Sequence, residues 1–350
     1  MTESPFMNVP TTSGVETTDY RELINSFQSV QTRIREQVRR VIVGQDDVVE
    51  HLLLTLLVGG HCLITGMPGT GKTLLVRTLA KSLGLTFKRI QFTPDLMPTD
   101  VTGTDIIDED VTTGHRKWTF VEGPIFTNVL LADEVNRTPP KTQAALLEAM
   151  QELSVTVRGT TYRLQPPFFV LATQNPIELE GTYPLPEAQL DRFLFNVVLD
   201  YLNASEEADV VLRNAVAQLG VVESCTNAEE IVRFQGLVRE VPIADDVVNY
   251  AVQFVRATRP TDPAATEKVK KYVNYGGSVR ATQFLVLAAR SRALLEGRFH
   301  VTVADLHALA LPVLRHRVLT NFHAESDGVT VDDVLKDLIA QKPAPTANRQ

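Results

Sequence analysis

The stretch GMPGTGKT, residues 66–73, decides the fold of this chain. Its glycines frame four residues and are followed by Lys72 and Thr73, which is the spacing of a phosphate-binding P-loop. The glycines let backbone N–H groups turn toward phosphate oxygens, Lys72 can reach the β- and γ-phosphates, and the Thr73 hydroxyl can bind Mg²⁺. A short apolar run at 62–65 precedes the octet, and a helical pattern at 74–84 follows it. The sequence therefore predicts a nucleoside triphosphate site.

Length and composition predict a two-domain protein of ordinary soluble type. The chain has 350 residues, of which 44% are hydrophobic and 22% are charged. Its net charge of −8 is opposite to that expected of a protein that grips nucleic acid along its surface. It contains two cysteines, no visible signal peptide and no apolar run long enough to span a bilayer. We therefore expect a cytoplasmic protein that does not insert into membranes and for which nucleic acid is a disfavoured partner.

The pattern along the chain predicts an α/β core followed by a helical domain. Residues 1–18 and 342–350 are predicted to be disordered. In residues 19–203, short apolar runs alternate with helical segments, which is typical of a parallel sheet flanked by helices. Residues 204–341 are mainly helical in pattern. The candidate strands are 62–65, 87–93, 128–134, 168–174 and 195–200.

Polar residues end or follow two of these apolar runs, and an arginine precedes a third. Asp133 and Glu134 end one run, where an aspartate can hold Mg²⁺ through water and a glutamate can polarise the attacking water. A surface turn would be the better interpretation of this acidic pair if no P-loop were present. Asn175 ends another run and can position a water, although Asn-Pro also commonly starts a turn. Arg192 can neutralise charge on a γ-phosphate from a neighbouring subunit, and the sequence does not separate this role from that of a salt-bridged surface arginine.

The ordered set GMPGTGKT, VLLADE, LATQNP, LDRF and GGSVRA resembles an AAA+ ATPase. Four longer stretches narrow the resemblance to the MoxR family: QFTPDLMPTDVTG (91–103), WTFVEGPIF (118–126), ADEVNRTPPKTQAALLEAMQE (132–152) and GTYPLPEAQLDRFLF (181–195). The similarity covers about residues 30–320. It implies an AAA+ core with a C-terminal α-helical lid, and hydrolysis of ATP with Mg²⁺.

The resemblance also implies a role for each motif. The P-loop matches Walker A, Asp133 and Glu134 match Walker B, Asn175 matches sensor 1, and Arg192 matches the arginine finger. Arg280 matches the sensor 2 arginine, which touches the γ-phosphate from the lid, although GGSVR (276–280) lacks the proline usual in this motif. Catalysis is thus assigned to Glu134, Arg192, Asn175 and Lys72, and the metal to Thr73 and Asp133. The residues expected around ATP are Val43, Gly44, Gln45, Pro68, Gly69, Thr70, Gly71, Lys72, Thr73, Leu74 and Arg280.

Three further stretches receive an interpretation. The resemblance implies that 94–103 is a helix-2 insert and that 152–167 is a β-hairpin turning about Gly159, both facing the pore of a ring. Trp118 is interpreted as a hairpin or core aromatic. The basic stretch LRHRV (314–318) is interpreted as a solvated helix face.

The resemblance implies a ring-forming homo-oligomer, a hexamer by preference, that remodels other proteins. Its partners would include a protein that carries a von Willebrand factor A domain. A motor subunit of a metal-chelatase-like enzyme remains an alternative, as does a nucleic-acid translocase, which the acidic balance disfavours. A regulatory switch with little turnover is a further alternative, and the intact Asp133–Glu134 pair and Arg192 argue against it.

Overall fold

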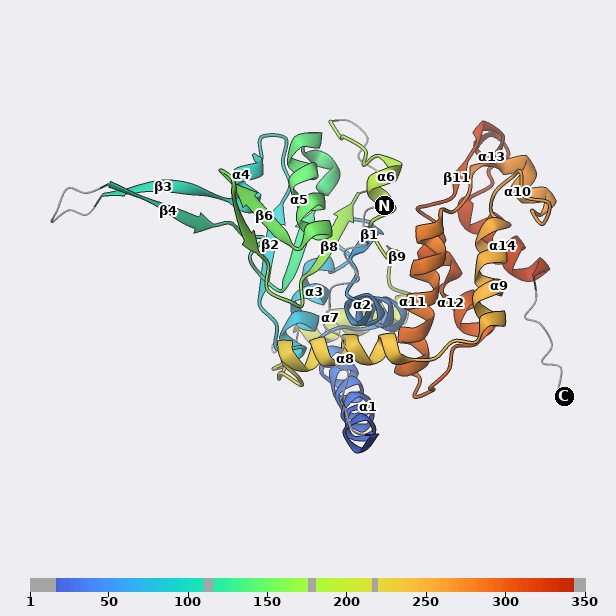
Figure 1. Cartoon of the computed structure of the whole chain (residues 1–350), viewed down its shortest axis with the longest axis horizontal. Helices are drawn as coiled ribbons and strands as arrows, with labels where there is room; N and C mark the ends of the chain where they lie inside the picture. The colour runs from blue at the N-terminus through green and yellow to red at the C-terminus, as the bar shows by residue number, and fades with distance from the viewer. Residues whose placement is uncertain (1–16, 110–115, 176–180, 216–219, 343–350) are drawn as a thin grey trace.

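A computed structural model describes residues 17–109, 116–175, 181–215 and 220–342, and its centre is a five-stranded parallel sheet (Figure 1). The strand order is β2-β5-β8-β1-β9. Each strand coincides with one of the five apolar runs, so the predicted strands are confirmed. Their bounds are β1 (Cys62–Gly66), β2 (Phe87–Gln91), β5 (Val129–Asp133), β8 (Phe169–Gln174) and β9 (Phe195–Leu199).

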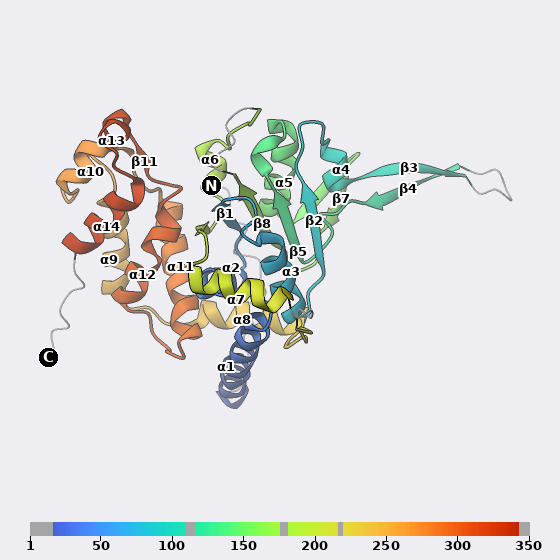
Figure 2. The ribbon, with the colours of Figure 1, turned by 180° about the vertical axis from the view of Figure 1, so that it is seen from behind.

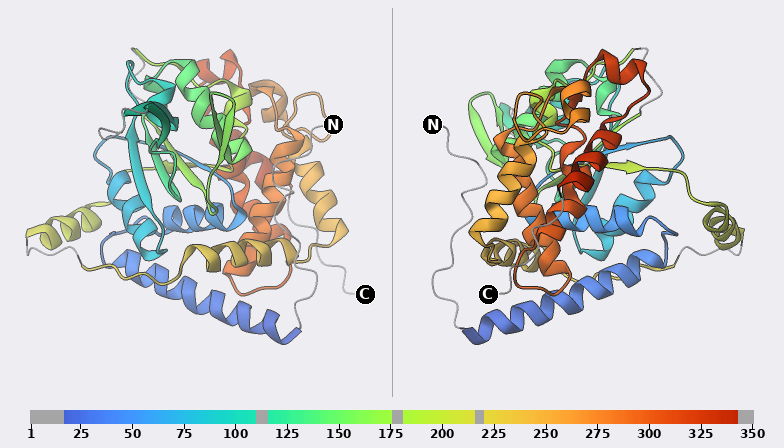
Figure 3. Two further views of the ribbon diagram at one scale, coloured as in Figure 1. Left: turned by 60° about the vertical axis from the view of Figure 1, so that its left-hand side comes forward. Right: turned by 90° about the vertical axis from the view of Figure 1, so that its right-hand side faces the viewer.

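Helices cover both faces of the sheet, because successive side chains of a strand point to opposite sides. Ile64, Leu131 and Leu171 pack on one face with α2 (Asp46–Val58) and α3 (Lys72–Ser82). Their neighbours Leu63, Leu130 and Val170 pack on the other face with α5 (Pro140–Glu152). The strands are thus buried on both sides, which explains their continuous apolar runs. A long helix, α1 (Thr17–Arg39), lies along α3 and α8 (Ala228–Glu240) (Figure 3).

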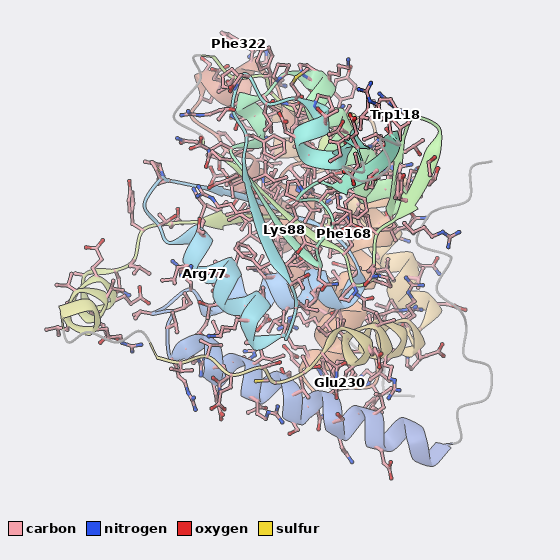
Figure 4. The ribbon with its side chains drawn as sticks, turned by 90° about the vertical axis from the view of Figure 1, so that its left-hand side faces the viewer. Arg77, Lys88, Trp118, Phe168, Glu230 and Phe322 are labelled. Atoms are coloured by element: carbon pink, nitrogen blue, oxygen red, sulfur yellow. The ribbon has the colours of Figure 1, made fainter. Side chains whose placement is uncertain are left out.

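Two hairpins extend the core. A short helix, α4 (Pro98–Thr102), leads into β3 (Gly103–Glu109) and β4 (Arg116–Glu122), and this hairpin projects far from the sheet (Figure 1). The insert predicted at 94–103 therefore continues into a hairpin that ends at Glu122. Trp118 lies on β4 with 55% of its surface exposed, so it is a hairpin residue and not a core residue. Figure 4 views the molecule from the side of the hairpin and of the edge strand β2, which carries Lys88.

The second hairpin lies where the sequence predicts a hairpin, within 152–167, while its place at the pore of a ring stays a prediction. It consists of β6 (Ser154–Val157) and β7 (Thr160–Arg163), and Gly159 has a φ of +82° at its turn. Between β5 and α5 the chain forms a single 3₁₀ turn (Val135–Arg137).

The C-terminal part is a bundle of helices beside β9 (Figure 2). Its long helices are amphipathic or buried, and α11 also packs on α2 of the core. Within this bundle, β10 (Val273–Tyr275) and β11 (Leu319–Thr320) form an antiparallel pair of short strands. The helices are α9 (Asp245–Arg256), α10 (Glu267–Tyr272), α11 (Val279–Leu295), α12 (Val303–Leu314), α13 (Phe322–Ser326) and α14 (Val331–Gln341).

The remaining helices are α6 (Glu187–Leu190), which precedes β9, and α7 (Ala204–Ala215), which lies apart from the other helices (Figure 3). The domain boundary at 203–204 stays a prediction, and α8, on its C-terminal side, packs on α1, α2 and α11. The predicted disordered segments fall outside the described residues except for Thr17, Thr18 and Lys342. Within the described ranges, no helix has the length and apolar character needed to cross a bilayer.

Candidate nucleotide site

The P-loop links the carboxyl end of β1 to the start of α3. Gly69 and Gly71 have φ values of +83° and +80°, and a Cβ atom on either would meet no atom within 4 Å. Their conformation thus requires glycine while leaving open space above the loop, as a phosphate cradle needs. Gly66 is different, because a Cβ there would come within 2.7 Å of the Leu199 carbonyl oxygen in β9.

Lys72 lies folded onto the loop. Its Nζ donates to the carbonyl oxygens of Gly66 at 2.6 Å and Met67 at 3.0 Å. Burial lowers the pKa of Lys72, and the carboxylates of Asp133 and Glu134 act in the opposite direction. The ammonium group is therefore positioned at the mouth of the cradle, where phosphate oxygens can replace the two carbonyl acceptors.

A cavity of about 1200 Å³ adjoins the loop. Its apolar wall comes from the chain before α2 and from α7, which suits a planar base and a sugar. Gln45 donates from Nε2 to the Thr70 carbonyl oxygen at 3.3 Å and so ties the two sides together. Gly44 adjoins this wall, and Glu206 of α7 approaches it closely. Of the residues predicted around ATP, those that line the cavity are Val43, Gln45, Pro68, Gly69, Thr70, Gly71 and Leu74.

The two predicted acidic residues lie at the carboxyl end of β5 and share one hydroxyl group. Thr173 of β8 donates from Oγ1 to Asp133 Oδ1 at 2.5 Å and accepts from the Glu134 backbone N–H at 2.9 Å. Glu134 has φ +58° and ψ +48°, a left-handed conformation that is unfavourable for a residue with a side chain. Asn175 follows β8 by one position and is 8% exposed. The parallel strands thus bring five predicted residues together at their carboxyl ends, as the sequence predicts: Lys72, Thr73, Asp133, Glu134 and Asn175.

Side chains from β2 hold both acids. Arg89 Nη2 donates to Asp133 Oδ2 at 2.6 Å, and Gln91 Nε2 donates to Glu134 Oε2 at 2.7 Å. Arg137 adds an ion pair to Glu134 at 3.0 Å. Arg89 and Gln91 share one face because they are two residues apart in a strand. Nothing in the sequence motifs singled them out, although their place on the neighbouring strand brings them to the acids.

Arg192 and Arg280 lie at the other end of the sheet. The first residue of β9, Phe195, pairs with Cys62, whereas the P-loop begins at Gly66. A parallel strand rises about 3.3 Å per residue, so these two ends of β1 are roughly 13 Å apart. Arg192 donates to the Leu147 carbonyl oxygen of α5 at 3.0 Å, and Arg280 lies 3.7 Å from the carboxylate of Asp191. Neither arginine is among the described residues that line the cavity.

The prediction that LRHRV (314–318) is a solvated face is wrong. His316 and Arg317 are 6% and 7% exposed, and both bind the chain that enters β9. A basic run after a helix is usually solvated, but here its partner is an acidic residue 126 positions away. The sequence offered no local signal of that contact.

Comparison with known proteins identifies the family. The AAA family described as ATPases associated with various cellular activities matches residues 61–195, and an AAA lid domain matches residues 265–338. Chaperone MoxR1 of Mycobacterium tuberculosis is 42% identical over 312 residues, which are 89% of this chain and 81% of that protein. The chain belongs to the MoxR family of AAA ATPases.

Other MoxR relatives agree. Protein MoxR of Methylorubrum extorquens is 29% identical over 345 residues, covering 92% of this chain and 97% of that protein. A crystal structure of a protein assigned as an ATPase, from Cytophaga hutchinsonii, superposes with a TM-score of 0.87 at 38% identity. It covers 95% of this chain and 100% of that one. Membership in this family confirms the predicted AAA core and lid, while the roles of single residues stay predictions.

Proposed function

We propose that this MoxR-family ATPase hydrolyses MgATP at the contact between neighbouring copies of the chain and uses the cycle to remodel partner proteins. In this mechanism Lys72 binds the β- and γ-phosphates, and Thr73 and Asp133 hold Mg²⁺. Glu134 polarises the attacking water, which Asn175 helps to orient. The oxygen ligands that Thr73 and Asp133 offer suit Mg²⁺, which prefers hydroxyl, carboxylate and phosphate oxygens.

One observation carries the proposal: the two arginines predicted to act on the γ-phosphate, Arg192 and Arg280, lie toward the opposite end of β1 from the P-loop. An arginine that neutralises the γ-phosphate must contact it, whereas Arg192 here contacts α5 and Arg280 lies beside Asp191, away from the P-loop end of β1. We propose that both instead contact a nucleotide bound by a neighbouring copy. Such a head-to-tail contact uses two different surfaces and closes into a ring when its rotation allows. We propose a hexameric ring, with Arg280 acting alongside Arg192 at the same contact.

The projecting hairpin supports a protein as the remodelled partner. Ile106, Ile107 and Trp118 are each about half exposed on β3 and β4. Exposed apolar side chains gathered on one projection are typical of a protein-binding surface. The relative named Chaperone MoxR1 is consistent with this role. We extend the proposal to partners that carry a von Willebrand factor A domain.

The test is the dependence of ATPase activity on assembly. Specific activity should fall as the protein is diluted until it is monomeric, and Arg192→Ala should lose about 10³-fold or more in kcat while still binding ATP. Glu134→Gln should bind ATP and turn over very slowly. Mixing Arg192→Ala with Glu134→Gln should restore activity, since each variant supplies what the other lacks. Constant specific activity in monomeric samples, or full activity of Arg192→Ala, would refute catalysis between subunits.

A further inference from the structure

A single buried arginine of the lid holds the segment that carries Arg192. The side chain of Arg317, just after α12, is only 1% exposed. A guanidinium group has five N–H donors, and here every nitrogen has an acceptor. Nε donates to the Asp191 carboxylate at 2.7 Å and Nη2 to the Asp191 carbonyl oxygen at 3.0 Å. The other acceptors are the carbonyl oxygens of Phe193, Leu194 and Val313.

Two neighbouring side chains add to the contacts between Arg317 and residues 191–194. His316 contacts the Phe193 carbonyl oxygen through Nε2 at 3.1 Å, and the ring of Phe284 in α11 lies 5.0 Å from the Arg317 guanidinium carbon. Burial lowers the pKa of Arg317 to about 10, and Asp191 opposes this shift, so the group stays charged at neutral pH. A buried cation of this kind is stable only while its acceptors stay in place. The chain at 191–194 and the end of α12 are thereby fixed to each other.

Asp191 extends the connection to the start of α11. Ser278 donates from Oγ to Asp191 Oδ2 at 3.1 Å, and the same hydroxyl caps α11 by accepting from the Ala281 backbone N–H. Arg280 is the second residue of that helix, and its Nη1 lies 3.7 Å from Asp191 Oδ2. One carboxylate therefore connects Arg317, the cap of α11 and Arg280, and it is adjacent in sequence to Arg192.

We infer that Arg317 is a positioning residue for Arg192 and Arg280, and that it makes both arginines move with the lid as one unit. This inference rests on the proposed function, because it assumes that Arg192 acts on a neighbour's nucleotide. Its physical basis is that four of the five acceptors belong to residues 191–194, so any shift of α12 displaces the backbone on both sides of Arg192. A structural arginine could have been satisfied by acceptors within the lid alone.

The experiment compares Arg317→Gln with Arg292→Gln. Arg292 also pairs with a buried lid carboxylate, that of Asp305 at 2.6 Å, and its other ion pair is with Glu296 of the lid, so it controls for a general loss of lid stability. We expect Arg317→Gln to bind a fluorescent ATP analogue within about 2-fold of wild type while kcat falls about 100-fold, the cost expected for an arginine misplaced by roughly 1 Å. Arg292→Gln should keep kcat within about 3-fold of wild type.

The ATPase activity of mixed assemblies separates a positioning role from a purely structural one. A variant that has only lost stability would not regain activity on mixing. Arg317→Gln keeps its own Glu134 and loses a well-placed finger, whereas Glu134→Gln keeps the finger. In an equal mixture, about a quarter of the sites join an intact Glu134 to an intact finger, so about a quarter of wild-type activity should return. If Arg317→Gln does not fold, Arg317→Lys carries the same test with a buried charge retained.

Arg192→Ala mixed with Glu134→Gln is the reference. Rescue of Arg317→Gln to the same extent as Arg192→Ala supports the inference. Rescue of Arg192→Ala without rescue of Arg317→Gln, or unchanged kcat in Arg317→Gln, overturns the inference and leaves the proposed function standing. A fully active Arg192→Ala overturns the proposed function itself, so the two failures are distinct.

Discussion

The hydroxyl of Thr173 offers a sharp test of how the catalytic acids are held. It donates to Asp133 Oδ1 at 2.5 Å and accepts from the Glu134 backbone N–H at 2.9 Å. Thr173→Val keeps the shape of the side chain and removes both hydrogen bonds. One bond involves a charged group, worth about 1.5–3 kcal/mol, and the buried N–H left unpaired costs about 1–3 kcal/mol. Part of this loss should appear as a midpoint of thermal unfolding lowered by about 4 °C.

The same substitution should separately slow catalysis, because the left-handed backbone of Glu134 depends on that N–H contact. A displacement of its carboxylate by about 1 Å predicts a fall in kcat of about 100-fold, with little change in the affinity for ATP. Thr173→Ser is the matched control, since it keeps the hydroxyl and loses one methyl group, worth about 1 kcal/mol. Steady-state ATPase assays and calorimetry on all three proteins measure both effects. Equal kcat values for the valine and serine variants would show that the hydroxyl serves stability alone.

Three further predictions concern the phosphate cradle, a buried histidine and the projecting hairpin. Lys72→Met should weaken ATP binding about 10- to 100-fold, the loss of charged hydrogen bonds to phosphate, and an unchanged dissociation constant would contradict this role. Burial lowers the pKa of His61 to about 4, below that of the unfolded chain, so its stabilising effect is complete above pH 6.5 and is lost as the pH falls toward 4. Wild type should therefore lose about 2 kcal/mol more than His61→Gln between pH 7 and pH 5 in urea unfolding, and parallel curves would refute this. Gly103→Ala would place a Cβ 2.3 Å from the Val121 carbonyl oxygen, so amide exchange in 103–109 should accelerate at unchanged ATP affinity; unchanged exchange would count against strain at this turn.

The sequence predicted the nucleotide half of the site because that half follows from local patterns. A P-loop needs its glycines and lysine in a fixed order, and buried parallel strands read as apolar runs that end in polar residues. The sequence alone therefore places Lys72, Asp133, Glu134 and Asn175 at the carboxyl ends of the parallel strands. Thr173 lies inside one of those runs, yet a threonine in a β-strand is too ordinary to be noticed.

The other half of the site depends on contacts between distant segments. Arg317 and Asp191 are 126 positions apart, and no local periodicity reports such a pair. The pattern of a basic run after a helix favours a solvated face, and tertiary packing overrode that expectation. Arg280 illustrates the same limit, because a motif gives its identity but only the fold shows that it lies beside Asp191. The hairpin of β3 and β4 was likewise only partly foreseen, from the single stretch around Trp118.

The polarity of the parallel sheet separates the two halves of the site, and β9 is the shortest connection between them. At its carboxyl end, Gly66 packs so closely on Leu199 that no side chain fits between the P-loop and the strand. At its amino end, Arg317 holds the residues on both sides of Arg192, the proposed arginine finger. The strand is five residues long and pairs with β1 along its whole length. A displacement of one end should therefore displace the other end by a similar amount. A shift of the P-loop on nucleotide binding would thus reach the segment that carries Arg192 through one rigid strand, and the lid would move with that segment because Arg317 holds them together.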